Sequence, residues 1–173
     1  REELLKVRQK VGIVFQDPND QLFAPTVKED VAFGPMNLGL DYDEVNARIK
    51  EALEMVGMSG FEDKTPHHLS GGQQKRVAIA GIIAMRPEIM ILDEPTAGVD
   101  IELRRSMWEY LTELNEQGTT IILTTHYLEE AEQLCRNIAI IDHGYIVENS
   151  SMRALLGQLS KETFLLDLNT KQQ

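Results

Sequence analysis

Short apolar segments recur along the chain and predict the strands of a sheet. They are Val11–Phe15, Ile89–Leu92, Thr119–Thr125, Ile138–Asp142 and Tyr145–Val147. The second is apolar at every position, as in strands that are buried on both faces of a parallel sheet. The last two flank a His143-Gly144 turn and therefore predict a hairpin.

Segments with helical spacing separate these strands. Residues 1–9 have the pattern of the end of a helix, and a second helix begins at an N-cap Asp43 and ends at Gly57. A third is expected from residue 70 to Met85, because the residue before Pro87 is disfavoured in the α conformation. A fourth runs from residue 101 and closes at residue 118. Strands that alternate with helices predict an α/β fold.

Composition limits the function classes. The chain has 173 residues, which suits a single domain, and 17 Lys and Arg against 28 Asp and Glu give a net charge of −11. That balance does not favour nucleic-acid binding, which needs concentrated basic residues. The single cysteine, Cys135, excludes an internal disulfide framework and suits a reducing compartment. The longest apolar run, Val77–Met85, is far shorter than the ~20 residues that span a bilayer.

Two adjacent carboxylates, Asp93 and Glu94, end the strand Ile89–Leu92. Ligands of open parallel sheets bind at the carboxyl ends of strands. Since side chains alternate along a strand, the two carboxylates point differently, so one can hold a hydrated metal ion while the other orients a water. The alternative is a strand end that has simply reached solvent.

Ser70-Gly71-Gly72-Gln73 precedes the third helix. Two glycines at a helix start let a phosphate approach backbone N–H groups in the positive field of the helix terminus. The same four residues also have the S-x-x-Q spacing of a capping box, which needs no ligand.

Three further polar residues lie near predicted strand or helix ends. Gln16 follows the first strand and could bind a metal ion or a water, and His126 follows the strand Thr119–Thr125. Asp100 precedes the helix at Ile101, where it can equally be a plain N-cap. Each of these three residues alone proves little.

The order of these motifs resembles that of ATP-binding cassette (ABC) ATPases over essentially the whole chain. Gln16 matches the Q-loop glutamine, residues 70–73 the signature motif, and Asp93-Glu94 the Walker B pair. Asp100 matches the D-loop aspartate and His126 the switch histidine. The resemblance implies a P-loop NTPase fold of the ABC-ATPase type, with a helical subdomain inserted into a parallel sheet.

The resemblance also implies a role for each residue, with ATP and Mg²⁺ as ligands. Asp93 would hold Mg²⁺ through its water shell, with Gln16 near the ion and the attacking water. Glu94 would be the general base, and His126 would stabilise the γ-phosphate in the transition state. Residues Ser70, Gly71, Gly72 and Gln73 would bind ATP held by a second ATPase subunit, and Asp100 would lie at that interface.

The expected partners are that second ATPase subunit and the transmembrane permease subunits of a transporter, which places the protein on the cytoplasmic face of the membrane. No nucleic-acid partner is expected. The resemblance divides the chain into residues 1–25, with the Q-loop strand, a helical subdomain at 26–86 that ends with the signature helix, and a core at 87–173. The coupling helix of the permease would contact the helical subdomain.

One motif of the family, G-x-x-x-x-G-K-[ST], does not occur in the sequence. This Walker A segment supplies the phosphate cradle and the Mg²⁺ hydroxyl. In the family it would precede Arg1, and its strand would lie between the strand that leads to His126 and the strand Ile138–Asp142. The chain begins without a methionine, which suits a piece of a longer protein, and we expect the 173-residue chain alone to hydrolyse ATP negligibly.

Two subfamilies are suggested by different parts of the chain. Residues 16–23 and 30–35 resemble cobalt/nickel and energy-coupling-factor importers, whereas 99–105, 125–132 and 162–168 resemble multidrug or polysaccharide exporter ATPases. A junction near residues 93–98, natural or artefactual, would explain the mixture. Two other functions stay open, namely a soluble ABC ATPase of DNA repair or translation and a non-catalytic interaction module.

Overall fold

The computed structural model describes residues 7–159, and the chain divides into two compact units, Arg1–Tyr127 and Leu128–Gln173. Residues 7–10 are helical. The other elements of the first unit are β1 (Val11–Val14), η1 (Pro18–Asp20), α2 (Val27–Asn37), α3 (Tyr42–Met55), η2 (Pro66–His68), α4 (Gly71–Ile83), β2 (Ile89–Asp93), α5 (Ile101–Glu116) and β3 (Thr120–Thr124). The second unit contains α6 (Leu128–Leu134), β4 (Asn137–Asp142), β5 (Tyr145–Ser151) and α7 (Met152–Leu159).

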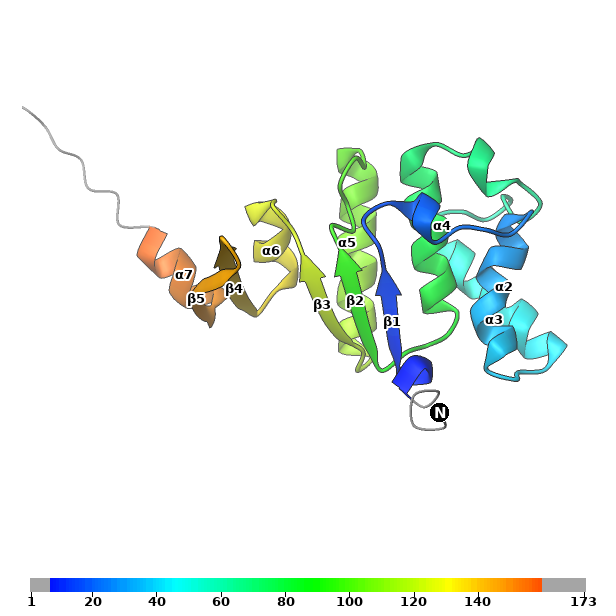
Figure 1. Cartoon of the computed structure of the whole chain (residues 1–173), viewed down its shortest axis with the longest axis horizontal. Helices are drawn as coiled ribbons and strands as arrows, with labels where there is room; N and C mark the ends of the chain where they lie inside the picture. The colour runs from blue at the N-terminus through cyan, green and yellow to red at the C-terminus, as the bar shows by residue number, and fades with distance from the viewer. Residues whose placement is uncertain (1–6, 160–173) are drawn as a thin grey trace, which may run out of the picture. The chain divides into compact units, whose positions relative to one another are not determined.

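Strands β1, β2 and β3 form a parallel sheet in that order (Figure 1). Val14 pairs with Leu92, and Leu92 pairs with Leu123, so the three strands end almost level. The predicted parallel strands are therefore confirmed. Their carboxyl ends lie at one edge of the sheet, where Gln16, Glu94 and His126 follow them.

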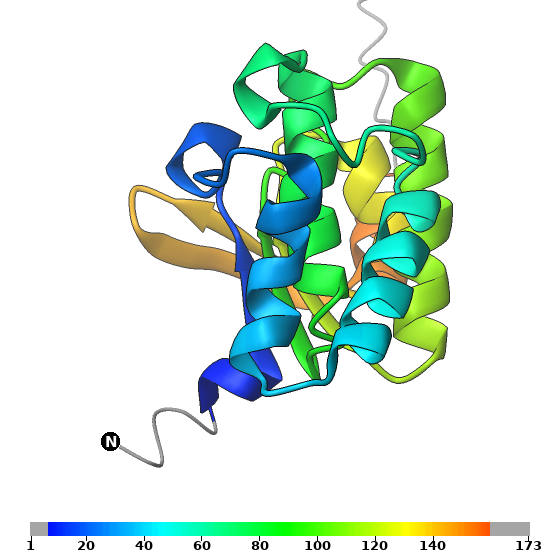
Figure 2. The same ribbon diagram turned by 90° about the vertical axis from the view of Figure 1, so that its right-hand side faces the viewer.

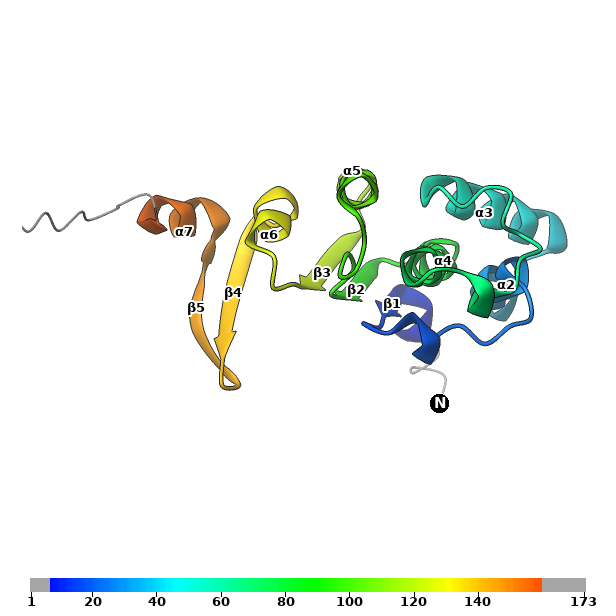
Figure 3. The same cartoon turned by 90° about the horizontal axis from the view of Figure 1, so that it is seen from above.

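Only one face of this sheet is covered within the first unit. Helices α4 and α5 both lie on the same side of the strands (Figure 3), where Val14, Met90 and Leu92 are fully buried. On the other face Ile13 is 44% exposed and Ile122 is 54% exposed. Ile89 and Ile91 of β2, the strand that the sequence predicts to be buried on both faces, are half-buried on this second face, because no described helix of the unit lies over it.

Helices α2, α3 and α4 pack against one another beside the sheet (Figure 2). Helix α3 begins two residues earlier than expected, because Asp41 and not Asp43 is its N-cap. The Asp41 carboxylate accepts a hydrogen bond from the Glu44 N–H at 2.9 Å. Asp43 lies in the first turn, where its negative charge stabilises the helix by interacting with the positive end of the helix dipole.

Helix α4 packs against both α2 and β1. It ends at Ile83, with Ala84 as C-cap, and so stops short of the predicted Met85. Arg86, the residue before Pro87, has a φ of +51°. Arg86 is thus outside the right-handed α conformation, as Pro87 requires, and the helix ends two residues before its apolar pattern does.

The second unit confirms the predicted hairpin. Strands β4 and β5 pair antiparallel around His143 and Gly144, whose φ values of +47° and +80° suit a two-residue turn with both central residues left-handed. Its small core consists of Ala131, Met152 and Leu155. Among the described residues no helix is long and apolar enough to cross a membrane.

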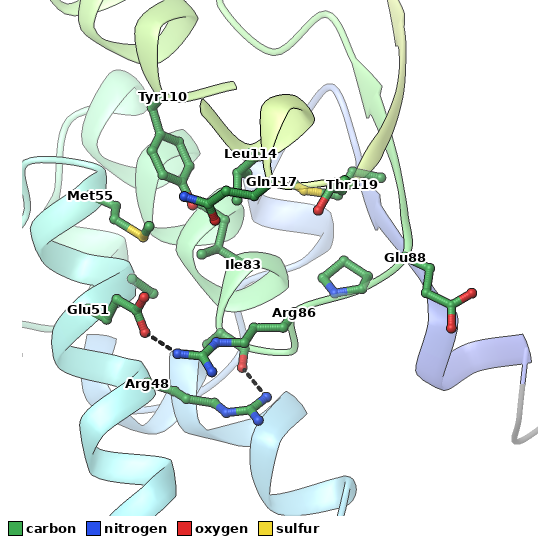
Figure 4. Close-up of a pocket in the computed structure, with 15 residues that line it drawn as sticks. Arg48, Glu51, Met55, Ile83, Arg86, Glu88, Tyr110, Leu114, Gln117 and Thr119 are labelled. Atoms are coloured by element: carbon green, nitrogen blue, oxygen red, sulfur yellow. Dashed lines mark hydrogen bonds and ion pairs between the residues drawn. The ribbon is translucent and has the colours of Figure 1, made fainter. Parts of the chain in front are cut away.

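A cavity of about 330 Å³ lies between α3, the end of α4 and the C-terminal part of α5 (Figure 4). Tyr110 points into it and is 6% exposed. Its hydroxyl has no hydrogen-bond partner among residues 7–159. Burial, with the nearby Glu51 and Glu113 carboxylates, raises the pKa of Tyr110 above its usual 10.0.

We expect Tyr110→Phe to raise the free energy of unfolding by about 1 kcal/mol, because a buried hydroxyl without a partner is costly. Because the pKa of Tyr110 is raised in the folded protein, this phenol ionises first in the unfolded chain as the pH rises above 10.0. Its ionisation therefore lowers the free energy of unfolding of the wild type, and Tyr110→Phe lacks this loss. Urea unfolding of both proteins from pH 7 to pH 11 measures the difference. A clear loss of stability in the variant would show that the hydroxyl is hydrogen-bonded.

Candidate functional site

Three side chains from the ends of three strands meet at the carboxylate of Glu94. Gln16 donates from Nε2 to Glu94 Oε2 at 2.9 Å, and His126 Nδ1 lies 3.1 Å from Glu94 Oε1. Gln16 follows β1, Glu94 follows β2 and His126 follows β3. The structure thus brings together the three residues that the sequence predicts as catalytic, across sequence separations of 78 and 32 residues.

The backbone of Glu94 is held in an uncommon conformation. Its φ is +45°, in the left-handed region, which is costly for a residue with a Cβ. The Glu94 N–H donates to the Thr124 carbonyl at 3.1 Å and to Thr124 Oγ1 at 3.2 Å. The Glu94 carbonyl accepts from the Ala97 N–H at 3.2 Å. These bonds fix the turn that directs the carboxylate toward Gln16 and His126.

Lys75 completes this turn, and the sequence analysis missed it as a site residue. Its Nζ donates to the Glu94 carbonyl at 2.5 Å, and Lys75 is only 3% exposed. It lies on α4, two residues after the signature motif. The signal in the sequence is a lysine two residues before the apolar run Val77–Met85, on a helix where an unpaired charge would be expensive to bury.

Asp93 is exposed at the end of β2, and its Oδ1 accepts a hydrogen bond from Thr124 Oγ1. No group of three or more His, Cys, Asp or Glu side chains within the described part of the chain is arranged to hold a metal ion. Mg²⁺ in phosphate sites needs fewer protein ligands, since it uses one or two carboxylates, waters and substrate phosphates. The carboxylate of Asp93 and the amide oxygen of Gln16 have the right chemistry for such a site.

Residues 70–73 form the capping box that the sequence also allowed. Ser70 Oγ accepts from the Gln73 N–H at 3.3 Å, and Gln73 Oε1 accepts from the Ser70 N–H at 3.0 Å. Gly71 and Gly72 have open space where a Cβ would lie, so a ligand can approach this backbone. Across residues 7–159, none of the hydrogen bonds of Glu94 involves these four residues, so the signature motif does not join the carboxylate cluster.

Asp100 is the N-cap of α5, as predicted, and its Oδ1 accepts from the Leu103 N–H at 3.0 Å. It also lies close enough to Arg76 of α4 to affect the pKa of that guanidinium. Burial lowers the pKa of Arg76, and the Asp100 carboxylate opposes that shift. Asp100 at the start of α5 and Arg76 on α4 therefore interact electrostatically.

The segment between Gln16 and α2 is anchored by Asp30. Its carboxylate accepts hydrogen bonds from the Phe23 N–H at 3.2 Å and the Ala24 N–H at 3.1 Å. Burial raises the pKa of Asp30, although these two N–H groups act in the opposite direction. The loop that follows Gln16 is thereby fixed to the first helix of the insertion.

We expect Lys75→Met to lower the free energy of unfolding by about 2 kcal/mol, the usual value for a hydrogen bond to a charged group. Lys50→Met is the control, because Lys50 is exposed on α3 and its loss should change stability by less than about 0.5 kcal/mol. Urea unfolding measures both. Equal effects would mean that the bond to Glu94 contributes nothing.

Comparison with known proteins agrees with the motif order. The family model of the ABC transporter matches residues 1–97. An energy-coupling factor transporter ATP-binding protein, EcfA, from Methanothermobacter thermautotrophicus is 56% identical over 85% of this chain and 47% of that protein. EcfA from Methanocaldococcus jannaschii is 51% identical over 92% of this chain and 57% of that protein. The chain spans about half the length of these curated relatives.

Solved structures give the same fold. The cbiO1 protein of Clostridium perfringens, part of the ABC transporter complex cbiONQ, is 39% identical with a TM-score of 0.80, over 92% of this chain and 64% of that one. A dimeric ATP-binding cassette bound to ADP and Pi is 31% identical with a TM-score of 0.79, over 88% of this chain and 67% of that one.

The predicted P-loop NTPase fold of the ABC-ATPase type is confirmed by these structures, and the resemblance to cobalt and energy-coupling-factor ATPases by the relatives. The exporter-like character of the C-terminal part stays a prediction, and its last segment, residues 162–168, lies outside the described residues. The family model matches more than half of the chain. The chain therefore belongs to the ABC transporter family, as part of its ATP-binding domain.

Proposed function

We propose that this chain is part of an ATP-hydrolysing subunit that energises an ABC membrane transporter of the energy-coupling-factor type. The observation that carries the proposal is the meeting of Gln16, Glu94 and His126 at the carboxyl ends of three parallel strands. The names of the EcfA and cbiO1 relatives support the transporter class.

In this proposal Glu94 is the general base that orients the attacking water toward the γ-phosphate. Gln16 and His126 each bind one oxygen of its carboxylate, so they hold Glu94 in place until the nucleotide binds. His126 then stabilises the charge that develops on the γ-phosphate. When bound through Asp93 and Gln16, Mg²⁺ supplies charge neutralisation on the phosphates.

The signature residues Ser70, Gly71, Gly72 and Gln73 are proposed to contact ATP held by a second ATPase subunit. The open space at Gly71 and Gly72 and the N-terminus of the long helix α4 suit a phosphate. Asp100 would lie at the same interface. The dimeric cassette with ADP and Pi supports this arrangement.

A cluster of exposed apolar side chains, Phe23, Phe33 and Met36, is the proposed docking surface for a transmembrane partner. Phe23 is 62% exposed and Phe33 is 51% exposed, and their rings meet edge to face with centroids 4.8 Å apart. Met36 follows Phe33 by three residues on α2, so the two share a helix face. An amphipathic helix of a permease would cover this cluster and hold the subunit at the cytoplasmic face of the membrane.

A non-catalytic interaction module is the second candidate, because the sequence contains no G-x-x-x-x-G-K-[ST] motif. Such a chain would keep the signature motif and the apolar cluster but bind no ATP of its own. A soluble ABC ATPase of DNA repair is less well supported, since the net charge of −11 disfavours nucleic acid and the named relatives are transporter subunits.

We expect the 173-residue chain alone to show negligible ATP turnover, and a protein in which a Walker A segment precedes Arg1 to hydrolyse ATP. In the latter, Glu94→Gln should lower kcat by at least about a hundredfold, the usual effect of losing a general base. A phosphate-release assay measures the rate. The control is Glu88→Gln at the opposite end of β2, where Glu88 pairs with Lys10 at 2.8 Å, far from the site.

Two outcomes separate the candidates. Steady turnover by the chain alone that Glu94→Gln abolishes would overturn the expectation of inactivity. A protein that carries a Walker A segment, binds ATP and still does not hydrolyse it would favour the non-catalytic module.

We expect Phe33→Ala to weaken association with the transmembrane partner at least tenfold, while ATP turnover of the uncoupled subunit stays unchanged. Large exposed aromatic side chains contribute most to such interfaces. Copurification with detergent-solubilised membranes measures association, and Tyr42→Ala, an aromatic residue 75% exposed elsewhere on the insertion, is the control. Equal binding by both variants would place the partner on another surface.

A further inference from the structure

Three side chains in contact, His126, Tyr127 and Arg104, form a row from His126 to α5. The Tyr127 ring lies on the His126 ring with centroids 4.0 Å apart and an interplanar angle of 39°. The guanidinium carbon of Arg104 lies 4.4 Å from the centroid of the Tyr127 ring. A cation over the face of an aromatic ring is attracted to it, so Arg104 holds the Tyr127 ring that lies against His126.

The contact between His126 and Tyr127 depends on a bend in the backbone. Successive side chains of a strand point to opposite faces, so the rings of adjacent residues do not normally contact each other. The Tyr127 N–H donates to Thr125 Oγ1 at 3.0 Å, a local bond that turns the chain just after β3. The bend brings both rings to the same side.

Arg104 is itself anchored to the turn that carries Asp100. Its backbone N–H donates to the Asp100 carbonyl at 2.9 Å, and its Nη2 donates to the Val99 carbonyl at 3.3 Å. The guanidinium therefore connects this turn with the Tyr127 ring. Through that ring it reaches the switch histidine within the same chain.

His126 needs such a restraint because its side chain is 57% exposed. An exposed side chain keeps rotamer freedom, and the bond to Glu94 is a single contact at one ring nitrogen. The Tyr127 ring supplies a second contact, against the imidazole ring. Two restraints in different directions fix both the position and the tilt of the ring.

We propose that Arg104 is a positioning residue for His126, which it holds in place by clamping Tyr127 against the imidazole. A displacement of the turn at residues 99–100 moves Arg104 and so changes the tilt of the imidazole. If a second subunit contacts Asp100, as in the proposed function, that contact is thereby transmitted to the histidine of the first. The role of His126 at the γ-phosphate rests on the proposed function, but the clamp does not.

The test is an NMR measurement on the gene product, purified with every segment that is translated with this chain and labelled with [¹³C]histidine. The two C–H signals of the His126 ring are assigned by their loss in His126→Gln. Tyr127→Leu removes the neighbouring ring, and the change in chemical shift that it causes is taken as the full displacement of these signals. Arg104→Ala is expected to move them in the same direction by at least half of that displacement, and Arg104→Lys by less.

Arg105→Ala is the matched control, because Arg105 is the next residue on α5, carries the same charge and is exposed. It should leave the His126 signals at their wild-type positions. The proposal is overturned if Arg104→Ala leaves the signals unmoved, or if Arg105→Ala moves them equally. Should Arg104→Ala fail to fold, Arg104→Gln replaces it with the same expectation.

The signals are read without nucleotide, so a protein that never hydrolyses ATP can still show the clamp. A normal effect of Glu94→Gln on turnover, with no displacement in Arg104→Ala, would retain the proposed function and remove the clamp. The two proposals can therefore fail separately.

Discussion

The left-handed turn at Glu94 is the constraint on which the site depends. A residue with a Cβ occupies this conformation only where surrounding bonds outweigh its cost of about 1–3 kcal/mol. Here those bonds come from Thr124 on the neighbouring strand, from Ala97 in the following turn and from the buried amine of Lys75. Because the turn is fixed, the carboxylate can meet Gln16 and His126 at the same time.

Helix α4 connects the parts of the first unit. Its N-terminus carries the capping box of Ser70, its second turn carries Lys75, and Ile83 at its end lines the cavity beside Tyr110. The same helix packs against α2, α3 and β1. A displacement of α4 at either end therefore changes its contacts with both the inserted helices and the sheet.

Much of this arrangement could be predicted from the sequence, because the deciding signals are local. Short apolar runs between helical segments gave the positions of β1, β2 and β3 to within a residue, and the order of motifs placed Gln16, Glu94 and His126 at one edge. Features that depend on tertiary contacts could not be predicted. Lys75 finds its partner 19 residues away, and Asp41 and Asp43 are equivalent as caps until the helix axis is known.

The face of the sheet that no described helix of the first unit covers has a consequence for handling the protein. Ile13 and Ile122 are about half exposed in the folded unit, and Phe15 beside them is 49% exposed. A contiguous apolar surface binds hydrophobic reporter dyes whether or not the chain is unfolded. Dye fluorescence would thus begin from a high baseline in the native state, and melting followed by circular dichroism or by tryptophan emission from the buried Trp108 would report unfolding more directly.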